Sequence, residues 1–384
     1  MFTKIEQQQR TLKVANLLQK QNISAVIICS NVNLLYVFGE IFNGYGIITA
    51  TGKNILLTKS EIKNAVYFNK PKEIIEIARE NGLEIDNTIC FDDEFMTASD
   101  YLFLSSCFKD YIISTNTKIF RLARMIKTDF EVEQILFSAK TNDRVYKEIP
   151  NFYKKHMTDI ELQVAIESYS RSLGHLGIFR TFGGKMECFM GSLLAGDNAS
   201  SPSPFDFALG GKGSSVSLPI GASGNEILPN QTIMVDLSGN VNGYLSDMSR
   251  TFYIGTLPNI AYKAYEVSEE IHHKCCELME KKAPCSELWN VSLEIAEKNN
   301  LTKYFMGNKK QAKFVGHGLG LEINELPVLT AKDTTLLQNG MVIALEPKFA
   351  IPGVGAIGNE DTYLICKSGY IRLTAASREL IKLD

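Results

Sequence analysis

The sequence predicts an α+β protein of two domains, a smaller α/β domain over residues 1–121 and a larger α+β domain over residues 122–384. The length of 384 residues is too great for one ordinary domain and fits two. Helix and strand signals alternate up to about residue 118, as in a small α/β domain. Beyond it, two helix starts precede a stretch over residues 176–257 that is rich in glycine, serine and β-forming residues, which is typical of antiparallel strands and turns.

The first domain begins with a helix. Residues 5–21 carry apolar side chains at helical spacing, and residues 25–29 are a short apolar run of the kind that forms a buried strand. Residues 45–50 and 54–58 are predicted to form two strands joined by a turn at residues 51–53.

Two capping boxes mark the first helices of the second domain. In Thr128 with Glu131, and in Thr158 with Glu161, a hydroxyl and a carboxylate accept hydrogen bonds from the free backbone amides of a first helical turn. Further helices are predicted over residues 259–282 and 286–299, and strands from residue 315 onward.

Composition and charge exclude several classes of protein. Apolar residues make up 45% and charged residues 22% of the chain, which is ordinary for a globular protein, and the formal net charge is −3. Lysine and arginine are scattered rather than gathered into a basic stripe, so no nucleic-acid partner is expected. The N-terminus lacks the apolar segment of a secretory signal, and no apolar run approaches the roughly 20 residues that span a bilayer. The eight cysteines form no CxxC pair, which favours the reducing cytoplasm. Together these features predict a soluble cytoplasmic protein without a membrane partner.

Two aspartates flank the dense turn chemistry of residues 239–243, Gly-Asn-Val-Asn-Gly. If the hairpin is centred between Val241 and Asn242, Asp236 and Asp247 become cross-strand partners with Cβ atoms roughly 5 Å apart. Two opposed carboxylates repel each other, so a sheet avoids this pairing unless a cation or a shared proton lies between them. A loop of another length would shift the register, so the pairing stays a prediction.

A second pair of acids flanks the turn signal Pro-Gly-Val-Gly. Glu346 and Glu360 are equally distant from Gly353, so two acids again face one another on opposing arms. Between the two hairpins lies His317, within Gly-His-Gly-Leu-Gly-Leu at residues 316–321, where the glycines allow close backbone approach.

Four carboxylates and one imidazole form a hard, oxygen-rich ligand set with one borderline nitrogen. Such a set suits Mn²⁺, Co²⁺, Fe²⁺ or Zn²⁺ better than a thiolate-seeking metal. Five protein ligands are too many for one tetrahedral zinc ion that must keep an open position, but they suit two ions about 3.5–4 Å apart with bridging carboxylates. We therefore expect a two-metal hydrolase site. The plainer interpretation is that each acid near a turn is solvated and the lone histidine is structural.

At these residues the sequence resembles the creatinase/aminopeptidase P/prolidase family, also called the pita-bread metallopeptidases, and within it the Xaa-Pro dipeptidases. The pieces that match, in the family's order, are VDLSGNVNGYLSDMSRTF, GHGLGLEINELP, and GMVIALEP with GNED. SAVIICSNVNLLYVFGE resembles the family's N-terminal domain and RMIKTDFEVEQI the entry to its C-terminal domain, so the resemblance covers nearly the whole chain. It implies a C-terminal pita-bread domain, a curved antiparallel sheet with helices, preceded by a creatinase-like domain.

The resemblance implies a role for each of the five candidate ligands. Asp236 would chelate one metal ion, while His317 and Glu346 would bind the other. Asp247 and Glu360 would bridge the two ions, which would be Mn, Co or Zn. Glu346 would also be the general base toward the attacking water. The family further implies a small peptide or amide substrate and a homodimer.

The sequence departs from the family where substrate is handled. Family peptidases usually carry a histidine at the position of Pro219 and another at that of Asn324, and often an arginine at that of Gly358. Those histidines bind the substrate carbonyl, and losing one such electrostatic donor can cost roughly 100–1000-fold in rate. Asn324 can still donate a hydrogen bond, whereas Pro219 cannot. Lys212, in the glycine-rich loop of residues 205–213, could supply the missing positive charge.

Three functions stay open. The first is a metal-dependent hydrolase of the Xaa-Pro dipeptidase or aminopeptidase type. The second keeps the fold and the metals but acts on a non-peptide small substrate, or is a catalytically weak homologue. The third is a non-enzymatic binding protein, which is disfavoured because several carboxylates are costly to bury together without a metal. Of the other histidines, His272 and His273 are expected on a helix surface and His175 at a helix end.

Overall fold

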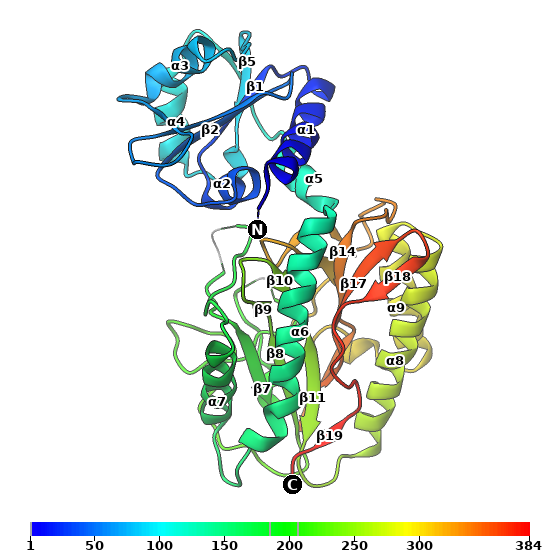
Figure 1. The fold of residues 1–384 in the computed structure, drawn as a ribbon. Helices are drawn as coiled ribbons and strands as arrows, with labels where there is room; N and C mark the ends of the chain where they lie inside the picture. Colours follow the sequence, from blue (N-terminus) through cyan, green and yellow to red (C-terminus); the bar gives the residue numbers. More distant parts are fainter. Residues whose placement is uncertain (1, 184–185, 206) are drawn as a thin grey trace. The chain divides into compact units, whose positions relative to one another are not determined.

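The computed structural model describes residues 2–183, 186–205 and 207–384. It divides into two compact units, Met1–Arg124 and Met125–Asp384, compared with the predicted boundary between residues 121 and 122 (Figure 1). Among the described residues, no helix has the length and apolar character needed to cross a membrane.

The first unit is a mixed sheet with helices. Its strands are β1 (Ala25–Ile28), β2 (Gly44–Thr49), β3 (Asn54–Thr58), β4 (Val66–Tyr67), β5 (Thr88–Phe91) and β6 (Ile112–Ser114). Its helices are α1 (Lys4–Lys20), α2 (Asn31–Phe38), α3 (Ile74–Glu80), α4 (Ala98–Cys107) and α5 (Ile119–Met125), with short 3-10 turns η1 (Pro71–Glu73) and η2 (Asp93–Phe95). The sheet has the order β4-β3-β2-β1-β5-β6, in which β2 is antiparallel to β1 and β3 and the other neighbours are parallel. The predicted first helix and the first three predicted strands are confirmed.

The second unit contains the longer helices and the acid-bearing hairpins. Its helices are α6 (Asp129–Phe152), α7 (Asp159–Ser172), α8 (Asn259–Glu280) and α9 (Cys285–Lys298), with 3-10 turns η3 (Gly196–Ser200) and η4 (Thr302–Tyr304). Its first strands are β7 (Gly191–Ala195), β8 (Thr232–Leu237), β9 (Gly239–Asn240), β10 (Leu245–Ser246) and β11 (Ser249–Tyr253). The later strands are β12 (Gly316–Gly318), β13 (Glu325–Val328), β14 (Val342–Leu345), β15 (Lys348–Ile351), β16 (Gly355–Gly358), β17 (Asp361–Cys366), β18 (Gly369–Arg372) and β19 (Ile381–Lys382). Both predicted capping boxes are present at the starts of α6 and α7.

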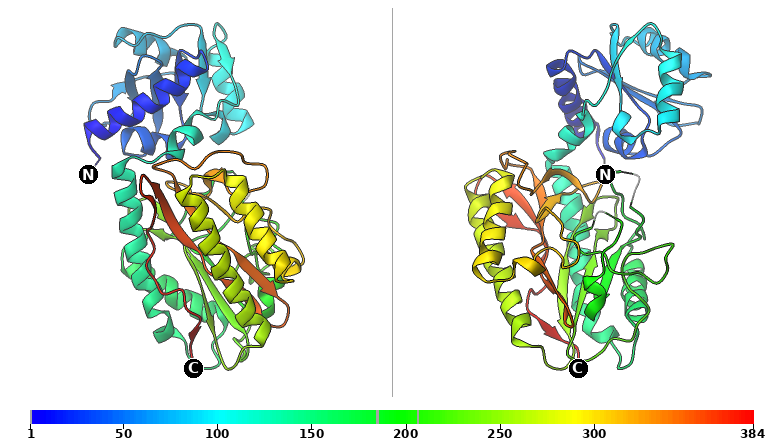
Figure 2. Two further views of the ribbon diagram at one scale, coloured as in Figure 1. Left: turned by 90° about the vertical axis from the view of Figure 1, so that its right-hand side faces the viewer. Right: turned by 180° about the vertical axis from the view of Figure 1, so that it is seen from behind.

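Each of two sheets in this unit is covered by a helix pair (Figures 1 and 2). One sheet has the order β19-β11-β8-β7 and the other β13-β12-β14-β17-β18. The side chains that bury α6 and α7 against the first sheet include Val145, Ile149, Leu162, Ile166, Leu193 and Val235. Those that bury α8 and α9 against the second include Ala264, Ile271, Leu288, Ile343 and Ile365. The helices thus keep water from the outer faces of these sheets. Of the strands around the acids, β8 and β11 belong to the first sheet, whereas β15 and β16 pair separately.

His272 is buried at 1% exposure, so the expectation that it lies on the surface is wrong. Its Nδ1 lies 3.2 Å from the Tyr363 hydroxyl and its Nε2 lies 3.0 Å from the Asn359 carbonyl oxygen. The next residue, His273, has a side chain that is 75% exposed, because neighbours on a helix of 3.6 residues per turn point in different directions. Burial, assisted by the positive charge of Arg378, lowers the pKa of His272 to about 3.

We expect acid to destabilise the protein through His272. The unfolded imidazole takes up a proton near pH 6.5, whereas its pKa in the fold is about 3. Its contribution to stability is therefore complete above pH 6.5 and is lost as the pH falls toward 3, by about 3 kcal/mol between pH 7 and pH 4. Denaturant unfolding across this range should show that His272→Gln lacks this loss and that His273→Gln keeps it. Parallel pH curves for wild type and both variants would contradict the assignment.

Candidate metal centre

The first acid hairpin is formed by β8 and β11. It sets Asp236 opposite Ser249 and not opposite Asp247. The predicted Asp236–Asp247 pairing is therefore wrong by two residues, because the turn is centred between Asn242 and Gly243, one position later than assumed. A φ of 94° at Gly243 favours glycine at this position of the turn. Asp247 lies in the irregular stretch between β10 and β11 and still joins the other acids.

The second acid hairpin has the predicted register. β15 pairs with β16 about Gly353, and the same register places Glu346 opposite Glu360 just beyond the paired strands. The Glu360 amide donates to the Ser249 carbonyl oxygen at 3.1 Å, which joins the second hairpin to the first. The two hairpins therefore present their acids to one another.

His317 lies at the centre of β12, between β13 and β14. A Cβ atom at Gly316 would lie 2.1 Å from the Ala344 carbonyl oxygen, and one at Gly318 would lie 2.1 Å from that of Leu326. The glycines on either side of His317 thus allow the close backbone approach that the sequence predicts.

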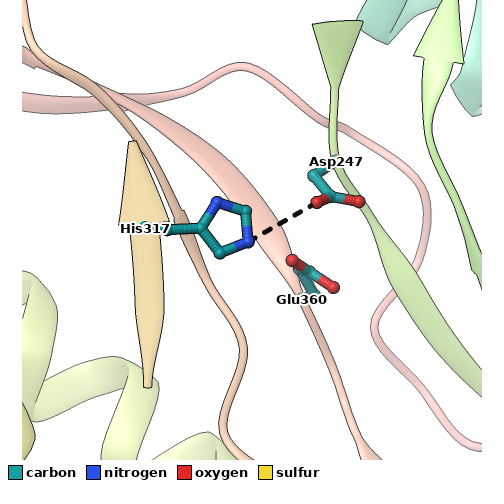
Figure 3. Close-up of side chains that lie close together, drawn as sticks. All are labelled: Asp247, His317 and Glu360. Atoms are coloured by element: carbon teal, nitrogen blue, oxygen red, sulfur yellow. Dashed lines mark ion pairs between the residues drawn. The ribbon is translucent and has the colours of Figure 1, made fainter. Parts of the chain in front are cut away.

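The hydrogen bond of the His317 ring indicates its tautomer. Nδ1 lies 3.1 Å from the Gly318 carbonyl oxygen, which can only accept, so Nδ1 carries a hydrogen and the lone pair of the neutral ring is on Nε2. Nε2 lies 3.8 Å from Asp247 Oδ2 (Figure 3). The same nitrogen lies 3.5 Å from Glu346 Oε1. A histidine fixed in this way directs a metal-ligating nitrogen toward the acids.

Asp247, His317 and Glu360 can hold one cation between them. Each offers a ligand atom, and these atoms all lie within 4.8 Å of one another (Figure 3). Among the described residues, Glu360 Oε1 is buried and has no hydrogen-bond partner. A buried carboxylate oxygen without a partner is costly, and a metal ion at this position would remove the cost.

Lys348 is a member of this cluster that the sequence analysis missed. Its Nζ lies 2.9 Å from Asp236 Oδ2, 2.7 Å from Glu346 Oε2 and 2.9 Å from Glu360 Oε2. Burial alone would lower the pKa of Lys348, but the charges of the three carboxylates raise it well above its ordinary value. Lys348 is therefore a fixed positive charge among the predicted metal ligands.

One lysine does not neutralise the four acids. Burial, together with the charges of Glu360 and Asp236, raises the pKa of Asp247 well above its ordinary value. Burial likewise raises the pKa of Asp236, although Lys348 opposes that rise. The donor set thus fits a divalent cation beside Asp247 and His317, while an ammonium stands beside Asp236.

Family models match nearly the whole chain. A creatinase/prolidase N-terminal domain matches residues 10–126, and metallopeptidase family M24 matches residues 133–367. The chain belongs to metallopeptidase family M24. The expected fold, a creatinase-type N-terminal domain followed by a pita-bread domain, is confirmed. M24 membership implies a divalent metal ion, for which Asp247, His317 and Glu360 are a candidate site.

Proteins with different printed functions match this M24 chain over nearly its whole length. The Xaa-Pro dipeptidase of Pyrococcus furiosus is 27% identical over 390 residues, which cover 97% of this chain and 99% of that protein. The crystal structure of the prolidase from Pyrococcus horikoshii OT3 has a TM-score of 0.78 at 23% identity and covers 97% of this chain and 100% of its own. The N-terminal domain of FACT complex subunit SPT16 from chickpea has a TM-score of 0.73 at 15% identity and covers 97% of both chains. At these identities the two structures show the fold alone.

The residues at the altered substrate positions of this M24 chain have other partners. Asn324 Oδ1 accepts from the Phe182 amide at 2.6 Å, and its Nδ2 donates to the Phe182 carbonyl oxygen at 3.1 Å. The carbonyl oxygen of Pro219 accepts from the Ser203 hydroxyl at 2.8 Å. Asn324 is thus engaged in holding a loop, with only one amide hydrogen left for a substrate.

Lys212 lies in a glycine-rich loop with its side chain exposed. Its amide donates to Asn198 Oδ1 at 2.7 Å, and residue 206 of the same loop lies outside the described residues. His175 is buried and bridges two backbone groups, with Nε2 3.0 Å from the Ser238 carbonyl oxygen and Nδ1 accepting from the Gly177 amide at 2.9 Å. Both nitrogens of His175 are therefore engaged in local structure.

Arg250 binds the backbone of Glu360, one of the candidate metal ligands. Its guanidinium is buried and donates to the Glu360 carbonyl oxygen at 2.7 Å and to Asp361 Oδ1 at 2.7 Å. It also donates to the carbonyl oxygens of Ser377 and Ala376. These bonds hold the backbone of Glu360 in place, so that its carboxylate is positioned before any ligand binds.

A cavity of about 360 Å³ has two neighbours of His317 in its lining, although none of the five candidate metal ligands lines it. Phe314, whose ring centroid is 6.3 Å from that of His317, and Val328, its cross-strand partner, line one side. Phe205 and Lys310 are among the other lining residues. This volume is in the range of small-molecule sites.

Proposed function

We propose that this chain is a metal-dependent hydrolase that cleaves the amide bond of a small peptide, as an Xaa-Pro dipeptidase or aminopeptidase does. The observation that carries the proposal is the cluster of Asp247, His317 and Glu360, which offer ligand atoms that all lie within 4.8 Å of one another. Within the described part of the chain, the buried Oε1 of Glu360 also has no hydrogen-bond partner. The cavity lined by Phe314 and Val328, two neighbours of His317, has the volume of a small-molecule site. The dipeptidase name of the Pyrococcus furiosus relative supports the Xaa-Pro specificity.

The residues divide the chemistry between binding and proton transfer. A divalent ion held by Asp247, His317, Glu346 and Glu360 would polarise the scissile carbonyl and make water a stronger nucleophile near neutral pH. Glu346 Oε1, on the His317 side, would accept a proton from the attacking water and return it to the leaving nitrogen. Glu346 Oε2 is held by Lys348, so the carboxylate keeps one orientation during the transfer.

A second candidate is hydrolysis of a small non-peptide amide. The engagement of Asn324 with Phe182 and the proline at position 219 favour it, because Asn324 keeps only one uncharged N–H and Pro219 has no N–H with which to bind a peptide carbonyl. The metal ligands would act as in the first candidate, and only the substrate would differ.

Hydrolysis of a substrate panel by the metal-loaded protein tests both candidates. Protein reconstituted with Mn²⁺, Co²⁺ or Zn²⁺ is assayed on Gly-Pro, Xaa-Pro-Xaa peptides and small amides. We expect Xaa-Pro cleavage that falls more than about 100-fold in His317→Ala, since even partners of metal ligands contribute 10–100-fold. His156→Ala, whose side chain is 72% exposed, should be unaffected. Cleavage of amides alone would favour the second candidate, and a metal-loaded protein that cleaves nothing would reject both.

A further inference from the structure

The side-chain ammonium of Lys348 places a positive charge where the predicted metal ligands converge. Its side chain is 1% exposed, and its ammonium lies within 2.7–2.9 Å of carboxylate oxygens of Asp236, Glu346 and Glu360. An ammonium has three donors and no acceptor. Each N–H therefore has a carboxylate acceptor, and the position is satisfied without a further ion.

Glu346 and Glu360 each bind Lys348 through Oε2, which leaves the Oε1 atom of each carboxylate for another partner. Oε2 of both Glu346 and Glu360 faces Lys348. Oε1 of Glu346 lies 3.5 Å from His317 Nε2, and Oε1 of Glu360 has no hydrogen-bond partner among the residues that the structure describes. One position therefore holds the ammonium, and Asp247, His317 and the Oε1 atoms of the two glutamates remain for a second cation.

We propose that the Lys348 ammonium replaces one of the two metal ions, so that this chain binds a single divalent ion at Asp247, His317, Glu346 and Glu360. This differs from the two ions that the sequence analysis predicts, because Asp236 is already paired with Lys348. The inference rests on the metal centre of the proposed function, but not on any hydrolysis.

The backbone fixes Lys348 in this position. It lies at the start of β15, and its carbonyl oxygen accepts from the Met306 amide at 2.7 Å. Its cross-strand partner is Gly358, where a Cβ atom would come within 3.1 Å of the Lys348 Cα. No side chain competes with Lys348 from the opposite arm of the hairpin.

Electrostatics oppose displacement of the lysine by a second ion. A metal ion at the same oxygens would lie beside a buried ammonium, and the like charges would repel strongly in a medium of low polarity. Moving Lys348 out would also require a route through packed surroundings, because its whole residue is 0% exposed.

Metal stoichiometry tests the proposal. Full-length wild type, Lys348→Ala and Lys127→Ala are stripped with chelator, reloaded with Mn²⁺, and measured by elemental analysis and native mass spectrometry. We expect about one ion per chain in wild type and about two in Lys348→Ala, in which the full dinuclear set is open. Lys127 is the matched control, since its buried ammonium pairs with Glu325 at 3.0 Å and its removal should leave one ion.

Each other outcome overturns the proposal. Two ions in wild type mean that the lysine does not occupy a metal position, and none means that no metal site remains. One ion in Lys348→Ala means that the lysine is not what excludes the second. If Lys348→Ala fails to fold, electron paramagnetic resonance of Mn²⁺-loaded wild type decides, because a coupled pair differs from the isolated ion that we expect. These results do not depend on whether any peptide is cleaved.

Discussion

Lys348→Ala is expected to destabilise the metal-free protein by about 3–5 kcal/mol, the usual effect of removing one partner from a buried ion pair. The loss arises because Asp236, Glu346 and Glu360 would keep their burial and lose the ammonium that contacts all three. Since 1 kcal/mol shifts Tm by about 2–4 °C in a domain of 150–250 residues, calorimetry with chelator present should show a fall in Tm of about 10 °C.

Metal should restore the stability of Lys348→Ala more than it raises that of wild type. An ion at 100 times its Kd adds about 2.7 kcal/mol, and the alanine variant has one more position to fill. Lys348→Met is the control, because its side chain occupies the same space without charge and leaves no room for a second ion. The interpretation would be rejected if Lys348→Ala were as stable as wild type in chelator.

Glu346→Gln is expected to lower kcat by about 10²–10⁴-fold on whichever substrate the wild type cleaves, the range for loss of a general base. The glutamine carbonyl oxygen can keep the contact with Lys348, now 2.7 Å from Glu346 Oε2. Its amide nitrogen would then face His317 and could not accept a proton. The variant should fold normally, since its size and its bond to Lys348 are retained.

The measurement is kcat at saturating substrate, with metal content determined on the same samples. A fall in kcat at full metal content assigns proton transfer to Glu346, whereas a parallel fall in metal content assigns it a ligand role only. Glu131→Gln is the matched control, because glutamine also forms the capping box that Glu131 makes with Thr128. Retention of more than about a tenth of wild-type kcat by Glu346→Gln would exclude it as the base.

The two hairpins show how far sequence reasoning carries. About Gly353 the predicted register is right, since the glycine-rich turn offers one symmetric centre between the glutamates. In the first hairpin the predicted centre is one position too early. Asn-Gly is the preferred turn pair of a tight hairpin, and Asn242 and Gly243 do occupy the centre. Giving weight to that pair would have set Asp236 opposite Ser249.

Lys348 was overlooked although the sequence contains a signal for it. Side chains alternate along a strand, so a residue two after Glu346 points to the same face. The predicted ligand set consists of carboxylates and one imidazole, and a lysine is not a ligand of that kind, so the set leaves out position 348. For His272 the difficulty was different, because two adjacent histidines among charged residues do not reveal which one the helix turns inward.

A cation that is part of the polypeptide has no dissociation equilibrium with the medium. The three carboxylates around Lys348 stay gathered whether metals are scarce or abundant, and chelators cannot extract their partner. Filling of the remaining position is then a single event without a neighbouring ion to assist it, so occupancy should follow a simple hyperbola with metal concentration. The fraction of protein with metal bound would therefore rise gradually with the concentration of free metal in the cell, without a cooperative threshold.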